Sequence, residues 1–142
     1  MTSVLLVGAG AVGARAARQL VEADDVDEVV IVDPNGSRRE AVVASTGDKA
    51  VDGGWGEPVR ETDAVLLAGP SAAHVDQARE HMAQGRPVVS CADGLDDVQA
   101  LLDLGPEAAE RGVPVVVGAG FSPGYTCLLA RHAASWFDEI DE

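Results

Sequence analysis

Three glycines near the start of the chain limit its fold more than any other feature of the sequence. They are Gly8, Gly10 and Gly13. An apolar run at residues 3–7 precedes them and has the composition of a strand buried on both faces. An apolar stripe with helical spacing follows, formed by Val12, Ala16 and Leu20. A strand, a glycine-rich turn and a helix in this order predict the first unit of a parallel α/β sheet.

The rest of the chain continues to alternate between strand and helix patterns. Further strands are expected at residues 29–32, 64–68, 88–89 and 114–117, with one short strand between residues 47 and 62. Helices are expected after the capping-box spacing of residues 37–40, from Ser71 onward, at residues 95–102 and 107–111 on either side of Gly105 and Pro106, and from Gly124. This alternation predicts an α/β fold, a doubly wound parallel sheet of Rossmann type. We assign it to residues 1–123, followed by a C-terminal helix in residues 124–142.

The glycine spacing itself is that of the dinucleotide fingerprint G-x-G-x-x-G. In this loop the first glycine makes a tight turn, the second lets a pyrophosphate approach the backbone, and the third lets the helix pack closely. The N–H groups at the start of the helix then face the phosphates. We therefore predict that the cofactor phosphates are held by Gly8, Gly10, Ala11, Val12 and Gly13.

Asp33 ends the second expected strand, 20 residues after Gly13, where the fingerprint places an acid for the adenosine ribose. A carboxylate there repels a 2′-phosphate, so the pattern predicts NAD(P) as the cofactor and favours NAD. Arg38 and Arg39 follow closely and would pair with a 2′-phosphate if they turned inward. The alternative is that both arginines lie in a solvated first helical turn.

Ligands of open α/β sheets bind at the carboxyl ends of the strands. Three expected strands end in small or polar residues, at positions 68–71, 90–94 and 118–124. The small residues Ala68, Gly69 and Pro70 leave space for the nicotinamide ribose. His74 follows them and is predicted to contact ribose or substrate, with a helix-surface position as the alternative.

No residue stands out as the catalyst, and the catalytic groups stay unknown at this stage. Asp93 is a candidate acid or base, and a helix N-cap is the competing interpretation. Cys91 has no histidine partner visible in the sequence, and His81 and His132 carry still weaker signals. Cys91 and Cys127 are the only cysteines and lie far apart, so neither a metal site nor a disulfide is expected.

Several stretches resemble a known family. VLLVGAGAVG, DAVLLAGPSAAHVDQA and VVVGAGFSPGYTCLLARHAA are similar to the N-terminal NAD(P)-binding domain of the saccharopine dehydrogenase-like family. They also resemble the related domains of homoserine dehydrogenase and of the glucose-fructose oxidoreductase type. The resemblance covers most of residues 3–135. It implies an oxidoreductase that transfers hydride between a nicotinamide and an amino or hydroxy acid type of small-molecule substrate, with a substrate domain following residue 123.

Two other functions remain open from the sequence alone. A nucleotide-sensing regulatory domain of the potassium-transport type has the same fold at about this length and needs no catalytic residue. A methyltransferase also combines a glycine-rich first loop with an acid at the end of the second strand.

The charge balance excludes further classes. The 142 residues include 24 acids and 10 bases, for a formal net charge of −14. Such a surface repels nucleic acid and acidic membranes, and no apolar run approaches the roughly 18 residues of a membrane span. With the start of the first strand so close to Met1, a cytoplasmic location is expected.

The end of the chain carries an apolar stripe at spacings of three and four residues. It consists of Tyr125, Leu128, Leu129, Ala133, Trp136 and Phe137. In a chain with only 4% aromatic residues, this stripe is too apolar to remain in water. Either this helix folds back onto the sheet, or it meets something outside one chain, and we favour the second: a homo-oligomer contact or a contact with a missing substrate domain.

Overall fold

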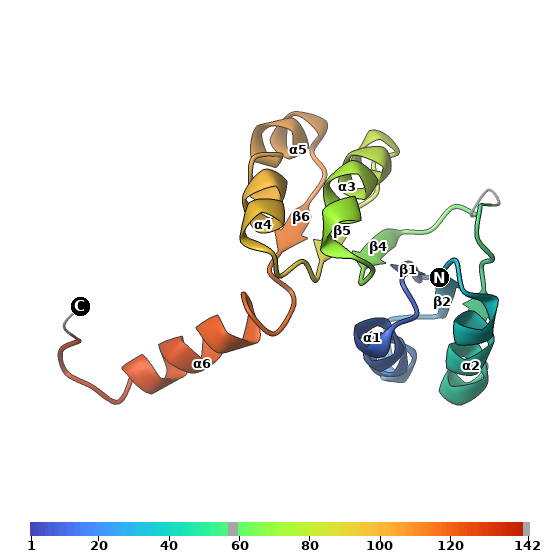
Figure 1. Ribbon diagram of the computed structural model, residues 1–142, viewed down its shortest axis with the longest axis horizontal. Helices are drawn as coiled ribbons and strands as arrows, with labels where there is room; N and C mark the ends of the chain where they lie inside the picture. The colour runs from blue at the N-terminus through green and yellow to red at the C-terminus, as the bar shows by residue number, and fades with distance from the viewer. Residues whose placement is uncertain (57–59, 141–142) are drawn as a thin grey trace.

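The computed structural model describes residues 1–56 and 60–140 (Figure 1). Within these residues, all strands belong to one parallel sheet with the order β3-β2-β1-β4-β5-β6. The strands are β1 (Ser3–Val7), β2 (Glu28–Val32), β3 (Ala50–Asp52), β4 (Ala64–Leu67), β5 (Val88–Ser90) and β6 (Val115–Val117). The strand order reverses on either side of β1, as in a doubly wound fold, so the predicted fold class is confirmed.

Helices cover both faces of this sheet (Figure 1). The helices are α1 (Ala11–Glu22), α2 (Gly36–Thr46), α3 (His74–Ala83), α4 (Leu95–Leu102), α5 (Gly105–Arg111) and α6 (Tyr125–Ala134). Helices α1 and α2 pack on one face, whereas α3, α4 and α5 pack on the other. A short 3₁₀ turn, Ser71–Ala73, precedes α3.

Successive side chains of the central strand supply the two cores alternately. Val4 and Leu6 of β1 are buried against α1 and α2, while Leu5 and Val7 are buried on the α3 side. Each fully buried aliphatic side chain of this size contributes about 1.5–3 kcal/mol. A strand with two apolar faces is therefore stable only at the centre of a sheet covered on both sides.

The face of α1 differs from the expected stripe. Val12 is exposed, whereas the buried positions of the helix are Gly13 and Ala17. Ala16 and Leu20 still pack against the core, but at its margin. The reason is the close approach of Gly13 to the glycine turn, which rotates the adjacent Val12 away from the sheet.

Three helix starts also differ from the expectations. Helix α2 begins at Gly36, because the Asn35 side chain accepts a hydrogen bond from the Arg38 N–H at 3.1 Å and acts as the N-cap. Ser71 does not cap α3, since it opens the 3₁₀ turn. Helix α5 begins at Gly105 and not at Glu107, so Gly105 and Pro106 belong to the helix. Proline is well suited to the first turn of a helix, where its missing N–H costs no hydrogen bond.

Helix α6 projects away from the rest of the domain, with the C-terminus beyond it (Figure 1). None of its residues is buried. The alternative in which this helix folds back onto the sheet is therefore not seen.

Candidate functional site

The glycine loop after β1 is shaped by two positions that tolerate no side chain. Gly8 has φ of +104°, and a Cβ there would lie 2.6 Å from the Gly69 nitrogen. A Cβ on Gly13 would collide with the Gly8 carbonyl oxygen. These contacts explain Gly8 as the tight turn and Gly13 as the point of close packing.

Gly10 has a different explanation. Its φ of −75° suits any residue, and a Cβ built on it would meet no atom within 4 Å. Gly10 is the N-cap of α1, and it has no side chain that could bond the first N–H groups of the helix. These N–H groups belong to the exposed Ala11 and Val12 and to the buried Gly13. The combination leaves an open approach to uncapped N–H groups at a helix N-terminus, which is suited to an anion.

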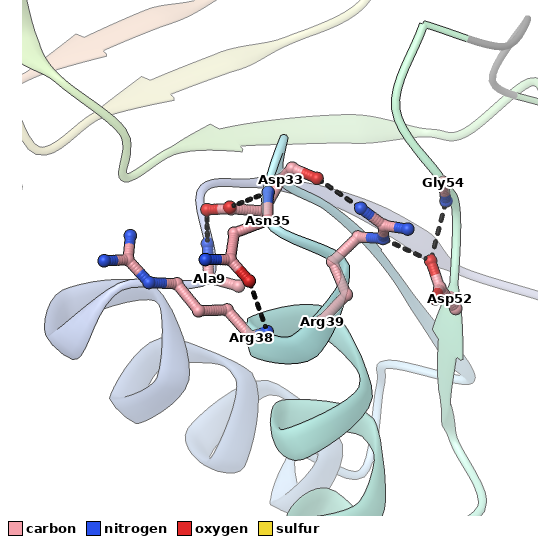
Figure 2. Close-up of polar contacts among 7 residues, drawn as sticks. All are labelled: Ala9, Asp33, Asn35, Arg38, Arg39, Asp52 and Gly54. Carbon is pink, nitrogen blue, oxygen red and sulfur yellow. Dashed lines mark hydrogen bonds and ion pairs between the residues drawn. The ribbon is translucent and has the colours of Figure 1, made fainter.

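Asp33 ties this loop to the turn after β2 (Figure 2). One carboxylate oxygen accepts a hydrogen bond from the Ala9 N–H at 2.8 Å, and the other accepts one from the Asn35 N–H at 2.8 Å. The side chain is buried, with 6% of its surface exposed. Each carboxylate oxygen keeps a further lone pair, so Asp33 anchors the loop and still presents an acceptor.

The two arginines that follow have separate roles (Figure 2). Arg39 donates from Nε to Asp52 Oδ1 at 2.7 Å and from Nη1 to the Asp33 carbonyl oxygen. The Gly54 N–H and Arg39 together hold the pKa of Asp52 below its usual value. Arg38 is exposed, and its guanidinium makes no hydrogen bond or ion pair within residues 1–56 and 60–140. Of these two arginines in the described residues, Arg38 is the one whose guanidinium is free to meet a ligand.

A cleft of about 740 Å³ lies at this carboxyl edge of the sheet. Of the residues expected at the cofactor site, it is lined by Gly8, Asp33, Gly69 and Pro70. Sequence analysis missed several of its walls, namely Asn35, Trp55, Ala73 and Gln77. Trp55 lies in the glycine-rich stretch after β3, where no periodicity marked a position, and 52% of its surface is exposed.

The segment 118–124 is rich in glycine for reasons internal to its own turn. Gly118 and Gly124 have φ of +77° and +127°, and a Cβ on Gly124 would collide with the Gly118 carbonyl oxygen. A Cβ on Gly120 would lie 3.2 Å from the Cys91 carbonyl oxygen. The turn therefore needs these glycines to pass beside β5 and lead into α6.

His74 is fully buried, which corrects the alternative of a helix-surface position. Its ring nitrogens contact Ser90 Oγ at 2.8 Å and the Gly69 carbonyl oxygen at 3.2 Å. Burial lowers the pKa of the imidazole. Because the ring is enclosed, its link with the cleft runs through Gly69.

The remaining candidates have separate surroundings. Asp93 is not an N-cap, because Gly94 caps α4 and the Asp93 carboxylate accepts a hydrogen bond from Ser71 Oγ at 3.1 Å. Burial raises the pKa of the Cys91 thiol, which keeps it protonated and weakly nucleophilic. His81 is buried beside Arg86, and His132 packs against Trp136 on α6.

A family model for an oxidoreductase family with an NAD-binding Rossmann fold (GFO/IDH/MocA) matches residues 2–119. The chain belongs to this family. The resemblance to NAD(P)-binding oxidoreductase domains is thereby confirmed through the glucose-fructose oxidoreductase type, which sequence analysis named as a relative. NAD is the cofactor of the fold, and neither the regulatory nor the methyltransferase alternative is favoured.

Solved structures of this oxidoreductase fold include longer enzymes. Saccharopine dehydrogenase from Saccharomyces cerevisiae superposes with a TM-score of 0.74 at 22% identity, over 95% of this chain and 31% of the yeast chain. Myo-inositol dehydrogenase from Corynebacterium glutamicum superposes with a TM-score of 0.66 at 21% identity, over 99% of this chain and 43% of that enzyme's chain. Scyllo-inositol dehydrogenase from Lactobacillus casei, solved with NAD(H) and scyllo-inositol, superposes with a TM-score of 0.71 at 14% identity. The superposition covers 99% of this chain and 43% of that enzyme's chain. The chain thus spans less than half the length of each.

In the described part of this oxidoreductase domain, no helix is both long and apolar enough to cross a membrane. The same residues contain no cluster of three or more histidine, cysteine, aspartate or glutamate side chains arranged to hold a metal ion.

Proposed function

We propose that the carboxyl-edge cleft binds NAD with its pyrophosphate at the glycine loop. Gly8, Gly10, Ala11, Val12 and Gly13 form the phosphate cradle. Gly10 carries this proposal, because a glycine with ordinary φ and open space around it has no packing role. The residues fit the cofactor, since uncapped N–H groups of α1 face that opening.

The rest of the cleft matches the two nucleosides. Asp33 and Asn35 lie where the adenosine ribose meets the end of β2, and Trp55 forms an aromatic wall beside them. At the other end, Ala68, Gly69 and Pro70 leave room for the nicotinamide ribose. His74 contributes from behind Gly69 and does not touch the cofactor.

The proposed reaction is hydride transfer between the nicotinamide and a carbon that bears an amine or hydroxyl group in a small-molecule substrate. The cofactor supplies the hydride chemistry, and the residues of this chain bind and orient it. No acid or base is assigned within residues 1–123, so in this proposal the groups that hold the substrate come from outside these residues. We accordingly expect this chain by itself to bind the cofactor without turnover.

Residues 124–142 are the proposed association segment. The exposed apolar residues in and around α6 are Phe121, Tyr125, Leu128, Leu129, Trp136, Phe137 and Ile140. Stable interfaces bury about 800 Å² on each partner, and side chains of this size and number supply an area of that order. For the chain alone we propose a second copy as the occupant, which would pair α6 with α6.

The Gly10→Val variant tests the cofactor site. A branched side chain there would fill the approach to the N–H groups, so NADH binding is expected to be lost with little change in melting temperature. Gly105→Val is the matched control, because a Cβ on Gly105 also meets no atom within 4 Å but lies away from the cleft. Binding is measured by NADH fluorescence. Wild-type affinity in Gly10→Val would place the pyrophosphate elsewhere.

A further inference from the structure

A buried chain of hydrogen bonds joins the carboxyl ends of β4 and β5. The Ala92 N–H donates to Ser90 Oγ at 3.1 Å, and Ser90 Oγ lies 2.8 Å from His74 Nδ1. On the other side of the ring, His74 Nε2 lies 3.2 Å from the Gly69 carbonyl oxygen. The side chains of Ser90 and His74 have no exposed surface. The turn after β4 and the turn after β5, about 20 residues apart in sequence, therefore meet at one imidazole.

Only one proton arrangement satisfies every group in this chain with a neutral ring. The Gly69 carbonyl can only accept, so the proton of the imidazole must lie on Nε2. Nδ1 is then an acceptor, and the Ser90 hydroxyl donates to it while accepting from the Ala92 N–H. Buried polar groups are satisfied in folded proteins, which selects this tautomer.

The bond to Gly69 acts on the wall of the cleft. Gly69 lines the cleft, and its nitrogen lies so close to Gly8 that a Cβ on Gly8 would approach it to 2.6 Å. The peptide at Gly69 is therefore packed against the turn of the glycine loop. A displacement of Gly69 would change the shape of the site at the point where the two loops meet.

We propose that His74 is a positioning residue of the cofactor site, whose Nε2–H holds the Gly69 carbonyl and so sets the β4–α3 turn against the glycine loop. The inference rests on the proposed function, because it assigns His74 an effect on cofactor affinity. The Ser90 hydroxyl orients the imidazole ring of His74, and the bond from His74 to Gly69 positions the wall of the cofactor site.

Two substitutions separate these bonds. In His74→Gln the side-chain amide reaches the position of Nε2 and keeps a donor for Gly69, whereas the acceptor for Ser90 is lost. In His74→Asn the shorter amide reaches only the position of Nδ1, so the Ser90 bond is kept and the Gly69 bond is lost. Each variant loses one buried hydrogen bond, so comparable falls in melting temperature are expected. Ser90→Ala is the control that removes the serine without touching the Gly69 bond.

The readout is the dissociation constant for NADH, measured by fluorescence titration of the full chain. His74→Gln and Ser90→Ala are expected to stay within about threefold of wild type, and His74→Asn to weaken about tenfold, which corresponds to one hydrogen bond. In wild type, ¹⁵N NMR is expected to show a proton on Nε2 and none on Nδ1.

Equal NADH affinities of His74→Gln and His74→Asn would overturn the proposal, as would a proton on Nδ1 in wild type. If His74→Asn fails to fold, the other two variants decide, and a tenfold loss in either of them contradicts the inference. A wild-type chain that binds no NADH would instead overturn the proposed function, and the positioning role with it.

Discussion

Asp33 shows at the residue scale how one side chain serves both the fold and the ligand. Its two oxygens accept hydrogen bonds from Ala9 and Asn35, so the acid expected to meet the ribose also closes the glycine loop. The two arginines that follow Asp33 differ in their contacts. Arg39 is held by Asp52, whereas Arg38 faces the cleft. We therefore expect cofactor preference to depend on the balance between Asp33 and Arg38.

The Asp33→Ala substitution is expected to narrow the preference for NADH over NADPH, because it removes the charge that repels a 2′-phosphate. One such charge contact is worth about 1–3 kcal/mol, or about 5- to 150-fold in relative affinity. The loop anchor is lost as well, so affinity for NADH should also fall. Arg38→Ala is the counterpart, expected to weaken NADPH alone. Dissociation constants for both cofactors measure the effect, and preference for NADPH in wild type would reverse the assignment.

Trp55 provides a direct report on the adenine end of the cleft. The chain has two tryptophans, so Trp55 is the one that remains in a Trp136→Phe background, and it is half exposed on the cleft wall. Stacking of an adenine on this ring is expected to quench its fluorescence. NADH and ADP-ribose should therefore quench saturably, whereas nicotinamide mononucleotide, which lacks the adenine, should not. Equal quenching by the mononucleotide would place the nicotinamide at Trp55.

At the scale of elements, α3 is a helix that buries two histidines together with its apolar residues, while its acids and its arginine are exposed. His74 and His81 lie in the same helix as the buried Ala78 and Met82. Burial lowers the pKa of both imidazoles, and the adjacent Arg86 lowers that of His81 further. The stability of the fold is therefore expected to depend on the protonation of these two histidines.

The free energy of unfolding is expected to fall as pH drops below about 6.5, the ordinary histidine value. The folded pKa values are depressed, so the unfolded chain takes up protons first, and stability is lost until the pH reaches the folded values. Each histidine contributes at most about 1.4 kcal/mol per pH unit. Urea denaturation at several pH values measures the slope. The His81→Gln substitution should reduce the slope, and an unchanged slope in this variant would contradict the prediction.

On the scale of the whole molecule, the chain consists of a well-packed sheet domain and a helix with no core. The sheet domain holds its apolar residues in two clusters, one on each face. In contrast, Trp136 has 73% of its surface exposed and Leu128 has 67%. A protein with a formal charge of −14 resists nonspecific association, so the proposed self-association is expected to run through this apolar helix.

Sedimentation at several concentrations is expected to show concentration-dependent self-association. Leu128→Asp should shift the chain to monomer, because it places a charge in the proposed contact. Leu102→Asp is the matched control, since Leu102 is also exposed but lies on α4. NADH binding should be unchanged in both variants, and no dehydrogenase turnover on amino or hydroxy acids is expected in either. A strict monomer whose Trp136 is shielded from quencher would show that the helix instead completes its own core.

The sequence by itself determined the fold class, the order of strands and helices, and the glycine loop. These features are local, because period and glycine spacing are set within about 20 residues of chain. The same locality explains the errors. Whether Asn35 or a serine caps α2, and whether Val12 or Gly13 faces the sheet, depends on rotations of one residue that the periodic pattern does not resolve.

Only the tertiary structure decided which polar groups meet. Ala9 and Asp33 lie 24 residues apart, and His74 and Ser90 lie 16 apart, yet each pair forms one buried hydrogen bond. Trp55 lies in the wall of the cleft, His74, expected to contact ribose or substrate, lies fully buried behind Gly69, and α6 has no core. The physical reason is that burial and partnership are properties of neighbours in space, which sheet pairing between distant segments brings together.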